Sequence, residues 1–236
     1  VVVCGYGPVD LTAIFDGGTV QWFDAKEDGN LVHTGPQFTT PSLSSSTSYW
    51  VSAGDVPDNV SAIVGTGTSS GTTSGTFLYH GWGGYKHQYI FTVAELTAAG
   101  LGTGYINGLE FQVVTTGISN RDDFSISLGT TSQNAATASH VDNNLLTEVY
   151  SNVSETFLIG TKTFTFTTPY FWDGISNLVV QTNWSNQNYG STSGALMYHT
   201  VSPSRTTYTY TDSRSAAQIL PVVTGNVAGS GGTSTA

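Results

Sequence analysis

The stretch LTAIFDGGTVQWFD, residues 11–24, decides the first part of the fold. Two short runs rich in apolar and β-branched residues flank the turn signal DGG, which is typical of a strand, a tight turn and a second strand. Similar runs follow at NLVHTG, QFTT and SYWVSA, separated by the turn signals EDGN and TGP. Strands at this spacing predict a small antiparallel sandwich over residues 1–56.

Four positions in this segment correspond to the marker positions of an immunoglobulin-type sandwich, but the two cysteines of its disulfide are absent. Such a domain carries a core tryptophan, a tyrosine corner and two cysteines that bridge its sheets. Trp22 and Tyr49 fit the tryptophan and the tyrosine, but Ala13 and Val51 stand at the cysteine positions. We therefore expect Ala13 and Val51 to face each other in the core near Trp22, so that packing replaces the bridge.

Cys4 is the single cysteine of the chain, so it cannot form a disulfide within it. One interpretation is a small, partly buried thiol. The other is pairing with a cysteine outside these residues, which an odd cysteine in a secreted protein favours.

The composition limits the classes of partner. The 236 residues include six Lys and Arg and carry a formal net charge of -10. Nucleic acid binding requires clustered cations, so it is not expected. No apolar run approaches the roughly 20 residues of a membrane-spanning helix, so membrane insertion is not expected either. An acidic chain rich in Thr, Ser and Gly fits a protein outside the cell.

A second domain is predicted over residues 57–224, followed by a linker-like tail at 225–236. Apolar residues alternate with polar ones along several of its segments, as in half-buried antiparallel strands, and ALMYHT, TTYTYT and AQILPVV are further strand candidates. Two packed sheets of such strands make a jelly-roll-like β-sandwich. The alternating positions are Leu109, Phe111 and Val113; Phe124, Ile126 and Leu128; Phe164 and Phe166; and Leu178 and Val180.

One short helix is predicted at 93–99. Thr92 and Glu95 have the spacing of a capping box. Gly100 suits the left-handed position that follows the end of a helix. The fold class expected for the chain is therefore all-β, with an Ig-like sandwich, a larger jelly-roll-like antiparallel sandwich and one short helix.

Ordered blocks of the sequence resemble a known class of protein. CGYGPVDLTA, QWFD and TPSLSSSTSYWV resemble the short Ig-like domains of large surface proteins secreted by Bacteroidota. QYIFTVAELTAAGLGTGYINGLEFQVV, FSISLGTT and YFWDGISNLVVQTNWSN resemble a β-sandwich repeat of giant Bacteroidota surface proteins, including gliding-motility adhesins and other cargo of the type IX secretion system. The resemblance implies a repetitive protein at the cell surface, and no catalytic set comes with it.

The residues give no convincing catalytic site. GTSSG at 67–71 matches the nucleophile-elbow pattern, but it lies in a Gly/Ser/Thr-rich loop, whereas the elbow needs a strand before it and a helix after it. The five histidines show no metal-ligand spacing. Asp122 and Asp123 could bind calcium through their oxygens, or they could form a solvated turn before a strand.

Aromatic residues suggest a ligand site. Trp82 and Tyr85 lie among glycines, and Trp184 and Tyr189 lie beside amide side chains. Exposed rings can cover the apolar face of a sugar while amides bind its hydroxyls. The alternative is that Trp82 and Trp184 close the ends of the sandwich.

We therefore expect a non-enzymatic pair of extracellular domains from a large bacterial surface adhesin or filament, acting as stalk or spacer and contributing to adhesion. The expected partners are neighbouring domains of the same long protein or copies of it, with surface polysaccharide as a further candidate. The alternative function is a carbohydrate-binding accessory region of a secreted enzyme. No cofactor other than calcium is suggested.

Overall fold

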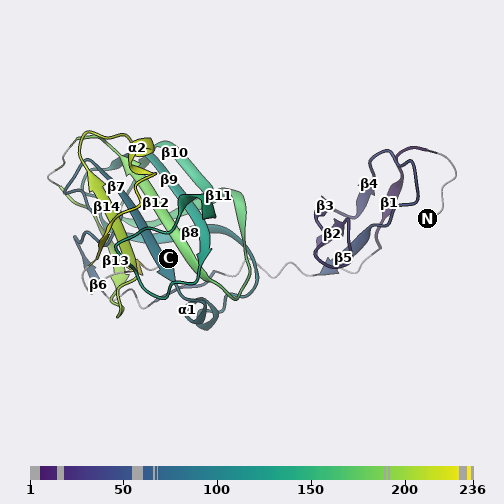
Figure 1. Cartoon of the computed structure of the whole chain (residues 1–236), viewed down its shortest axis with the longest axis horizontal. Helices are drawn as coiled ribbons and strands as arrows, with labels where there is room; N and C mark the ends of the chain where they lie inside the picture. Colours follow the sequence, from purple (N-terminus) through teal and green to yellow (C-terminus); the bar gives the residue numbers. More distant parts are fainter. Residues whose placement is uncertain are drawn as a thin grey trace. The chain divides into compact units, whose positions relative to one another are not determined.

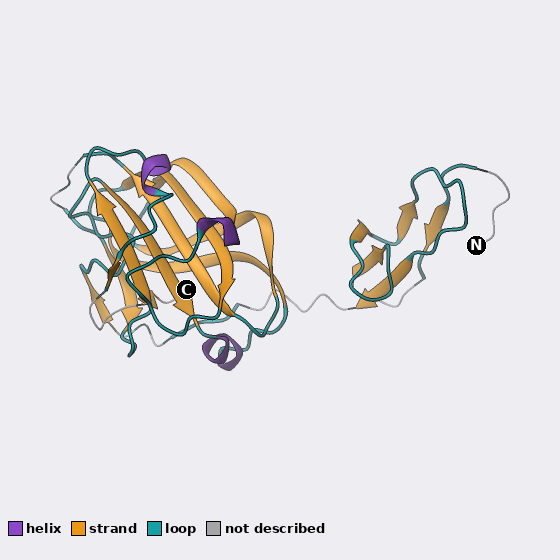
Figure 2. Cartoon of the chain, viewed as in Figure 1, coloured by secondary structure: helices purple, strands orange, loops and turns teal. Residues whose placement is uncertain are grey.

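Strands make up most of the regular structure, and helices are few and short (Figures 1 and 2). The computed structural model describes residues 6–14, 19–54, 61–65, 67, 69–188, 190, 192–228 and 233–234. The chain divides into two compact units, Val1–Ser61 and Ala62–Ala236. Every strand pairing described is antiparallel, so the predicted all-β class is confirmed.

The first unit has a two-stranded sheet and a three-stranded sheet, ordered β1-β4 and β3-β2-β5. All five predicted strands are present. Their bounds are β1 Asp10–Thr12, β2 Thr19–Phe23, β3 Leu31–Thr34, β4 Gln37–Thr39 and β5 Trp50–Gly54.

A small aromatic core holds the first unit together. Trp22 is buried with Val20 and Phe38, and its indole N–H donates to the Gly35 carbonyl at 2.9 Å. The Tyr49 ring meets the Phe38 ring edge-on, with 5.1 Å between centroids. Trp22 therefore takes the predicted core position, with Tyr49 packed against this cluster.

The expected pair of Ala13 and Val51 does not form. Ala13 packs against the core, but Val51 is 49% exposed. Val51 does lie opposite Trp22 in the β2–β5 register, so the strand alignment is close to the expected one. Phe38 from β4 packs on Trp22 and is the core residue that the sequence comparison with disulfide-bridged domains missed. Cys4 lies outside the described residues.

The second unit contains two antiparallel sheets that enclose its main core (Figure 1). One sheet has the order β10-β9-β12-β7-β14-β15, and the other has the order β11-β8-β13-β16 with β6 also paired to β13. The strands are β6 Ser69–Gly71, β7 Gly84–Phe91, β8 Gly104–Thr115, β9 Asn120–Thr131, β10 Leu146–Thr156, β11 Gly160–Trp172, β12 Asn177–Ser185, β13 Ala195–His199, β14 Thr206–Thr211, β15 Asn226–Val227 and β16 Thr233–Ser234.

The alternating apolar positions predicted for this unit all contribute to one core. Nine of them are buried within it, and Leu109 packs against it. Phe77, which lies in a loop, fills the centre and contacts the rings of Phe111, Phe124 and Phe157. The period of two therefore identified the inward-facing side chains correctly.

The central strands β7 and β12 are buried on both faces. Segments following β9 and β14 cover the outer face of their sheet. The Lys86 ammonium donates to the carbonyls of Leu220 and Val222, at 2.8 and 2.6 Å. The Gln88 side chain exchanges two hydrogen bonds with the backbone of Val141. A layer of buried polar side chains thus fixes the covering loops to the sheet.

The predicted helix is confirmed as α1, Val93–Ala98. The Thr92 hydroxyl accepts from the Glu95 amide, and the Glu95 carboxylate accepts from the Thr92 amide, which completes the capping box. Gly100 follows with φ +95°.

Two predictions about the C-terminal part are wrong: the strand in AQILPVV and the linker-like tail that begins at residue 225. A second helix, α2, spans Ala216–Ile219 where the strand was expected. A short 3-10 helix, η1, spans Asn143–Leu145 in the middle of the unit. Residues 226–228 belong to the sandwich, because β15 pairs with β14 and Ala228 is buried. Among the described residues, no helix has the length and apolar character that crossing a bilayer requires.

Candidate ligand-binding surface

Two of the four predicted ligand-binding aromatics are core residues. Tyr85 and Trp184 are fully buried, and the Trp184 indole donates to the Phe77 carbonyl at 2.8 Å. Tyr189 lies outside the described residues. Trp82 is 40% exposed, so it alone of the described three is available to a ligand. Trp184 follows the alternative interpretation of a tryptophan that fills the sandwich.

Trp82 contacts an aromatic residue that was not among the four predicted ones, Tyr210. Its indole stacks on the ring of Tyr210 at the end of β14, with 4.8 Å between centroids and 22° between planes. Tyr210 is 37% exposed and stacks in turn on Tyr208, at 6.0 Å. The alternating TTYTYT segment could have indicated Tyr208 and Tyr210, because it puts both rings on one face of a strand.

Loops that are distant in sequence meet beside Trp82. The Asn186 amide donates to the Gly83 carbonyl at 2.8 Å, and the Gly83 amide donates to the Asp212 carboxylate at 2.6 Å. The Ser213 amide donates to the Gln187 carbonyl at 2.7 Å. The two aromatic and amide-rich segments singled out in the sequence are therefore joined by direct hydrogen bonds.

Gly83 explains the close approach of these loops. A Cβ atom built on Gly83 would lie 2.6 Å from the Gln187 carbonyl carbon and 2.7 Å from the Asn188 nitrogen. No other residue type fits there without moving the backbone. The backbone of the exposed Gln187 and Asn188 consequently lies against the residue that follows Trp82, so the loop that carries their amide groups runs beside the aromatic pair.

Unusual backbone conformations occur in these loops and in the adjoining start of β9. Four described non-glycine residues have positive φ, and three of them are Asp123 at 48°, Gln187 at 61° and Ser213 at 58°. Each such conformation costs about 1 kcal/mol or more and persists only where surrounding contacts impose it. The Asp122 amide, next to Asp123, donates to the Asn186 side chain at 3.0 Å. Hydrogen bonds therefore hold this end of the sandwich in one strained arrangement.

A buried arginine binds backbone carbonyls of the segments next to these loops. The fully buried Arg121 guanidinium donates to the carbonyls of Ile118, Asn120 and Leu78 at 2.8–3.0 Å, and it lies 4.7 Å from the Trp184 ring centroid. Burial lowers the pKa of Arg121 to about 10, so it remains charged at neutral pH. Carbonyl oxygens and a cation–π contact with the Trp184 ring thus stabilise the buried positive charge.

His80 is a neutral neighbour of this arrangement. Its ring lies 5.5 Å from the Trp184 ring, and burial, followed by the nearby Arg121 charge, lowers its pKa to about 4. At pH 7 it therefore contributes an uncharged, buried imidazole.

The proposed calcium ligands are engaged within the protein. The Asp122 carboxylate accepts from the Asn120 amide group at 3.0 Å and the Ser154 hydroxyl at 2.7 Å. Asp123 is exposed. Over the described part of the chain, no three His, Cys, Asp or Glu residues gather in a way that could hold a metal ion.

The residues that matched an esterase-type motif form part of a sheet. Ser69 and Ser70 belong to β6, which pairs with β13, so their segment is not the strand–turn–helix of a nucleophile elbow.

The Glu95 carboxylate pairs with Arg205 and lies 4.0 Å from His199 Nε2. These contacts connect the start of α1 to the last residue of β13 and to the residue before β14.

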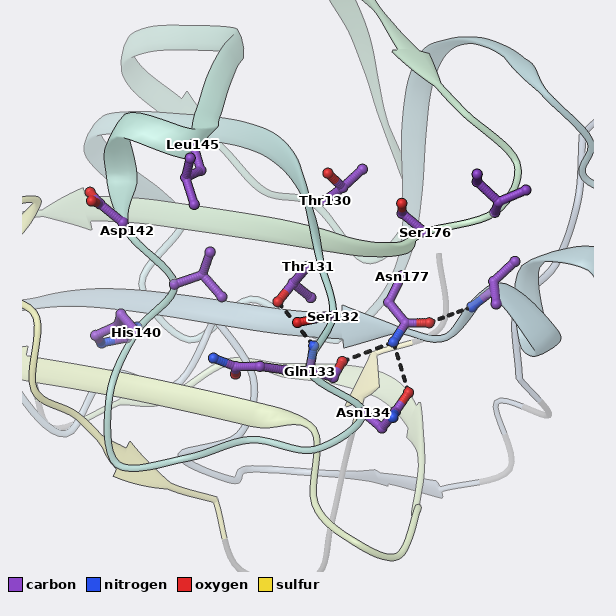
Figure 3. Close-up of a pocket in the computed structure, with 13 residues that line it drawn as sticks. Thr130, Thr131, Ser132, Gln133, Asn134, His140, Asp142, Leu145, Ser176 and Asn177 are labelled. Carbon is purple, nitrogen blue, oxygen red and sulfur yellow. Dashed lines mark hydrogen bonds between the residues drawn. The ribbon is translucent and has the colours of Figure 1, made fainter.

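Figure 3 shows a groove on the outer side of the six-stranded sheet, with a volume of about 740 Å³. Asn177 is its central polar residue, but its amide is fully used: Nδ2 donates to Gln133 O and Asn134 Oδ1, and Oδ1 accepts from the Val93 amide. The exposed Leu145 lies on its rim. Asn177 therefore has a structural role.

Comparison with known proteins identifies the first unit. Residues 1–59 match the family model described as "Ig-like domain CHU_C associated", a domain type of Bacteroidota surface proteins. No curated protein matches the chain, and no solved structure matches it. The first unit is an Ig-like domain, whereas the fold of the second unit rests on its own structure.

Proposed function

We propose that the chain is a non-enzymatic pair of domains from a large bacterial cell-surface protein, in which it acts as stalk or spacer and contributes to adhesion. The protein would be an adhesin or filament of the gliding-motility kind, exported by the type IX secretion system. The match of residues 1–59 to an Ig-like domain of surface proteins is the observation that carries this proposal.

The construction of the second unit supports a mechanical role. Its central strands have long, continuous antiparallel registers, as in β12 with β7 from Leu178–Phe91 to Ser185–Gly84. The covering loops are tied to these strands through Lys86 and Gln88. Proteolysis requires local opening of the chain, so loops held by buried hydrogen bonds suit a domain that is exposed outside the cell.

Assays for turnover test the non-enzymatic part of the proposal. The purified 236-residue chain is incubated with chromogenic peptide, ester and glycoside substrates. We expect no hydrolysis above that of buffer. Turnover that survives purification and is abolished by one point substitution would show that the chain is an enzyme.

A carbohydrate-binding accessory region of a secreted enzyme is the competing function, favoured by the exposed stack of Trp82 on Tyr210. The full-length gene separates the two functions. Further Ig-like and sandwich domains around this chain would support the stalk, and an adjacent catalytic domain would support the accessory region.

A further inference from the structure

We infer that the surface formed by Trp82, Tyr210, Gln187 and Asn188 binds a neutral polysaccharide. Trp82 and Tyr210 keep more than a third of their surface exposed although they are stacked on each other. Stacking on Tyr210 covers one face of Trp82, while Tyr210 is stacked on both Trp82 and Tyr208, so the exposed area belongs to the ring edges and to the part of Trp82 that Tyr210 leaves uncovered. These are apolar surfaces that a ligand can cover.

The neighbouring polar groups define the class of ligand. The side chains of Gln187 and Asn188 are exposed, and the close backbone contact at Gly83 holds their loop beside Trp82. An amide offers both donors and an acceptor, which is what a sugar hydroxyl requires. A sugar ring also presents a face of C–H groups, and the electron-rich face of an aromatic ring complements such a surface.

Charge favours an uncharged polymer over an acidic one. The start of β9, which is hydrogen-bonded to Asn186, and the loop after β14 together contain three carboxylates, Asp122, Asp123 and Asp212, against two guanidinium groups. One of these, Arg121, is fully buried, while Arg214 is exposed. An anionic polysaccharide would meet net repulsion here.

The strained loops favour binding through preorganisation. Gln187 and Ser213 are held at positive φ by the hydrogen bond between them and by their contacts with Gly83 and Asp212. A surface that is already ordered loses little conformational entropy when a ligand binds. The arrangement thus holds the aromatic pair and the backbone of the loop that carries the amides in fixed positions before the ligand arrives.

The chain offers a matched control in a second exposed aromatic pair. Tyr105 and Phe171 face each other across β8 and β11, 57% and 53% exposed, with 5.3 Å between ring centroids. This pair lies on β8 and β11, in the other sheet from β7 and β14. Its removal deletes as much exposed aromatic surface without touching the proposed site.

Affinity electrophoresis of the full chain tests the inference. The gels contain soluble xylan, mannan, β-glucan or starch as neutral polymers and polygalacturonate as an acidic one, and pull-down uses insoluble cellulose and chitin. We expect binding to at least one neutral polymer and none to polygalacturonate. Trp82→Ala and Tyr210→Ala should each weaken binding about 10-fold or more, which corresponds to about 1.4 kcal/mol, and Phe171→Ala should leave it unchanged.

Thermal unfolding of each variant excludes loss of fold as the cause, and Trp82→Phe should retain part of the affinity. Absence of binding to every neutral polymer would overturn the inference. So would equal binding by Trp82→Ala, preferential binding to polygalacturonate, or loss of binding in Phe171→Ala. These results leave the stalk role standing, because turnover assays and cell-surface labelling test that role separately.

Discussion

Arg121 illustrates how one residue supports the candidate site. It is a fully buried cation, and it supplies donors to three backbone carbonyls, of which that of Leu78 takes part in a fully buried hydrogen bond. Buried carbonyls left without donors cost about 1–3 kcal/mol each. The arginine therefore stabilises the segments around Leu78 and Ile118, which lie next to the candidate site in the chain or in the sheet.

Replacement of this residue should be strongly destabilising. Arg121→Met keeps much of the side-chain volume and removes every donor, so we expect the free energy of unfolding of the second unit to fall by about 2–4 kcal/mol. Arg214→Met, at an exposed position, should change it by less than about 0.5 kcal/mol. Urea unfolding measures both, and equal stabilities of the two variants would contradict this role of Arg121.

Three buried histidines make the second unit sensitive to acid. Burial lowers the pKa of His80 and His87 to about 4 and that of His140 to about 3. An unfolded histidine takes up its proton near pH 6.5, so between about pH 6.5 and 4 the unfolded chain binds more protons. Stability is therefore complete above about pH 6.5 and falls as the pH drops, by at most about 1.4 kcal/mol per pH unit for each histidine.

Urea unfolding at pH 7 and pH 5 measures this loss. We expect a lower free energy of unfolding at pH 5 and a smaller difference in His140→Gln, which lacks one of the three groups. Equal stability of the unsubstituted chain at the two pH values would contradict the buried, neutral state of these histidines.

At the scale of elements, the end of the sheet at β14 depends on residues 226–228. Thr207 pairs with Val227, Tyr208 pairs with Asn226, and the Ala228 amide donates to Thr206. Chains truncated after residue 225 and after residue 228 both lack β16, so their difference isolates this segment. We expect the shorter chain to be less stable by about 1–2 kcal/mol. Equal melting curves would show that the segment is a linker after all.

Strongly periodic or capped elements were predictable from the sequence. Phe124, Ile126 and Leu128 alternate without interruption and face the core, and Thr92 with Glu95 marks the start of α1. The apolar run AQILPVV favours a strand by its composition, so it does not indicate the helix α2. The signal was available in Ser215 and Gln218, since the Gln218 side chain accepts from the Ser215 amide as in a capping box.

The site was only partly predictable, because the exposure of a side chain depends on strands that are distant in the sequence. Trp82 and Trp184 both lie among small or polar residues in the sequence, yet one is exposed and the other is fully buried. The partner of Trp82 is Tyr210, more than a hundred residues away, and the stack exists only because β14 pairs with β7. Local patterns do not contain that pairing.

At the scale of the whole molecule, the two units have separate cores. Val20, Trp22 and Phe38 form the core of the first unit, while the second has its own large aromatic core. Each unit therefore has the elements of an independently stable domain. This organisation suits a long surface protein, in which such units are joined along one chain.

Display on the cell surface is the claim on which the proposed role depends most, and antibody labelling measures it directly. An antibody raised against the purified chain is added to intact and to permeabilised cells of the producing bacterium. The proposed role predicts equal labelling of both, because the chain is already outside. Labelling that appears only after permeabilisation would place the chain inside the cell and contradict the account.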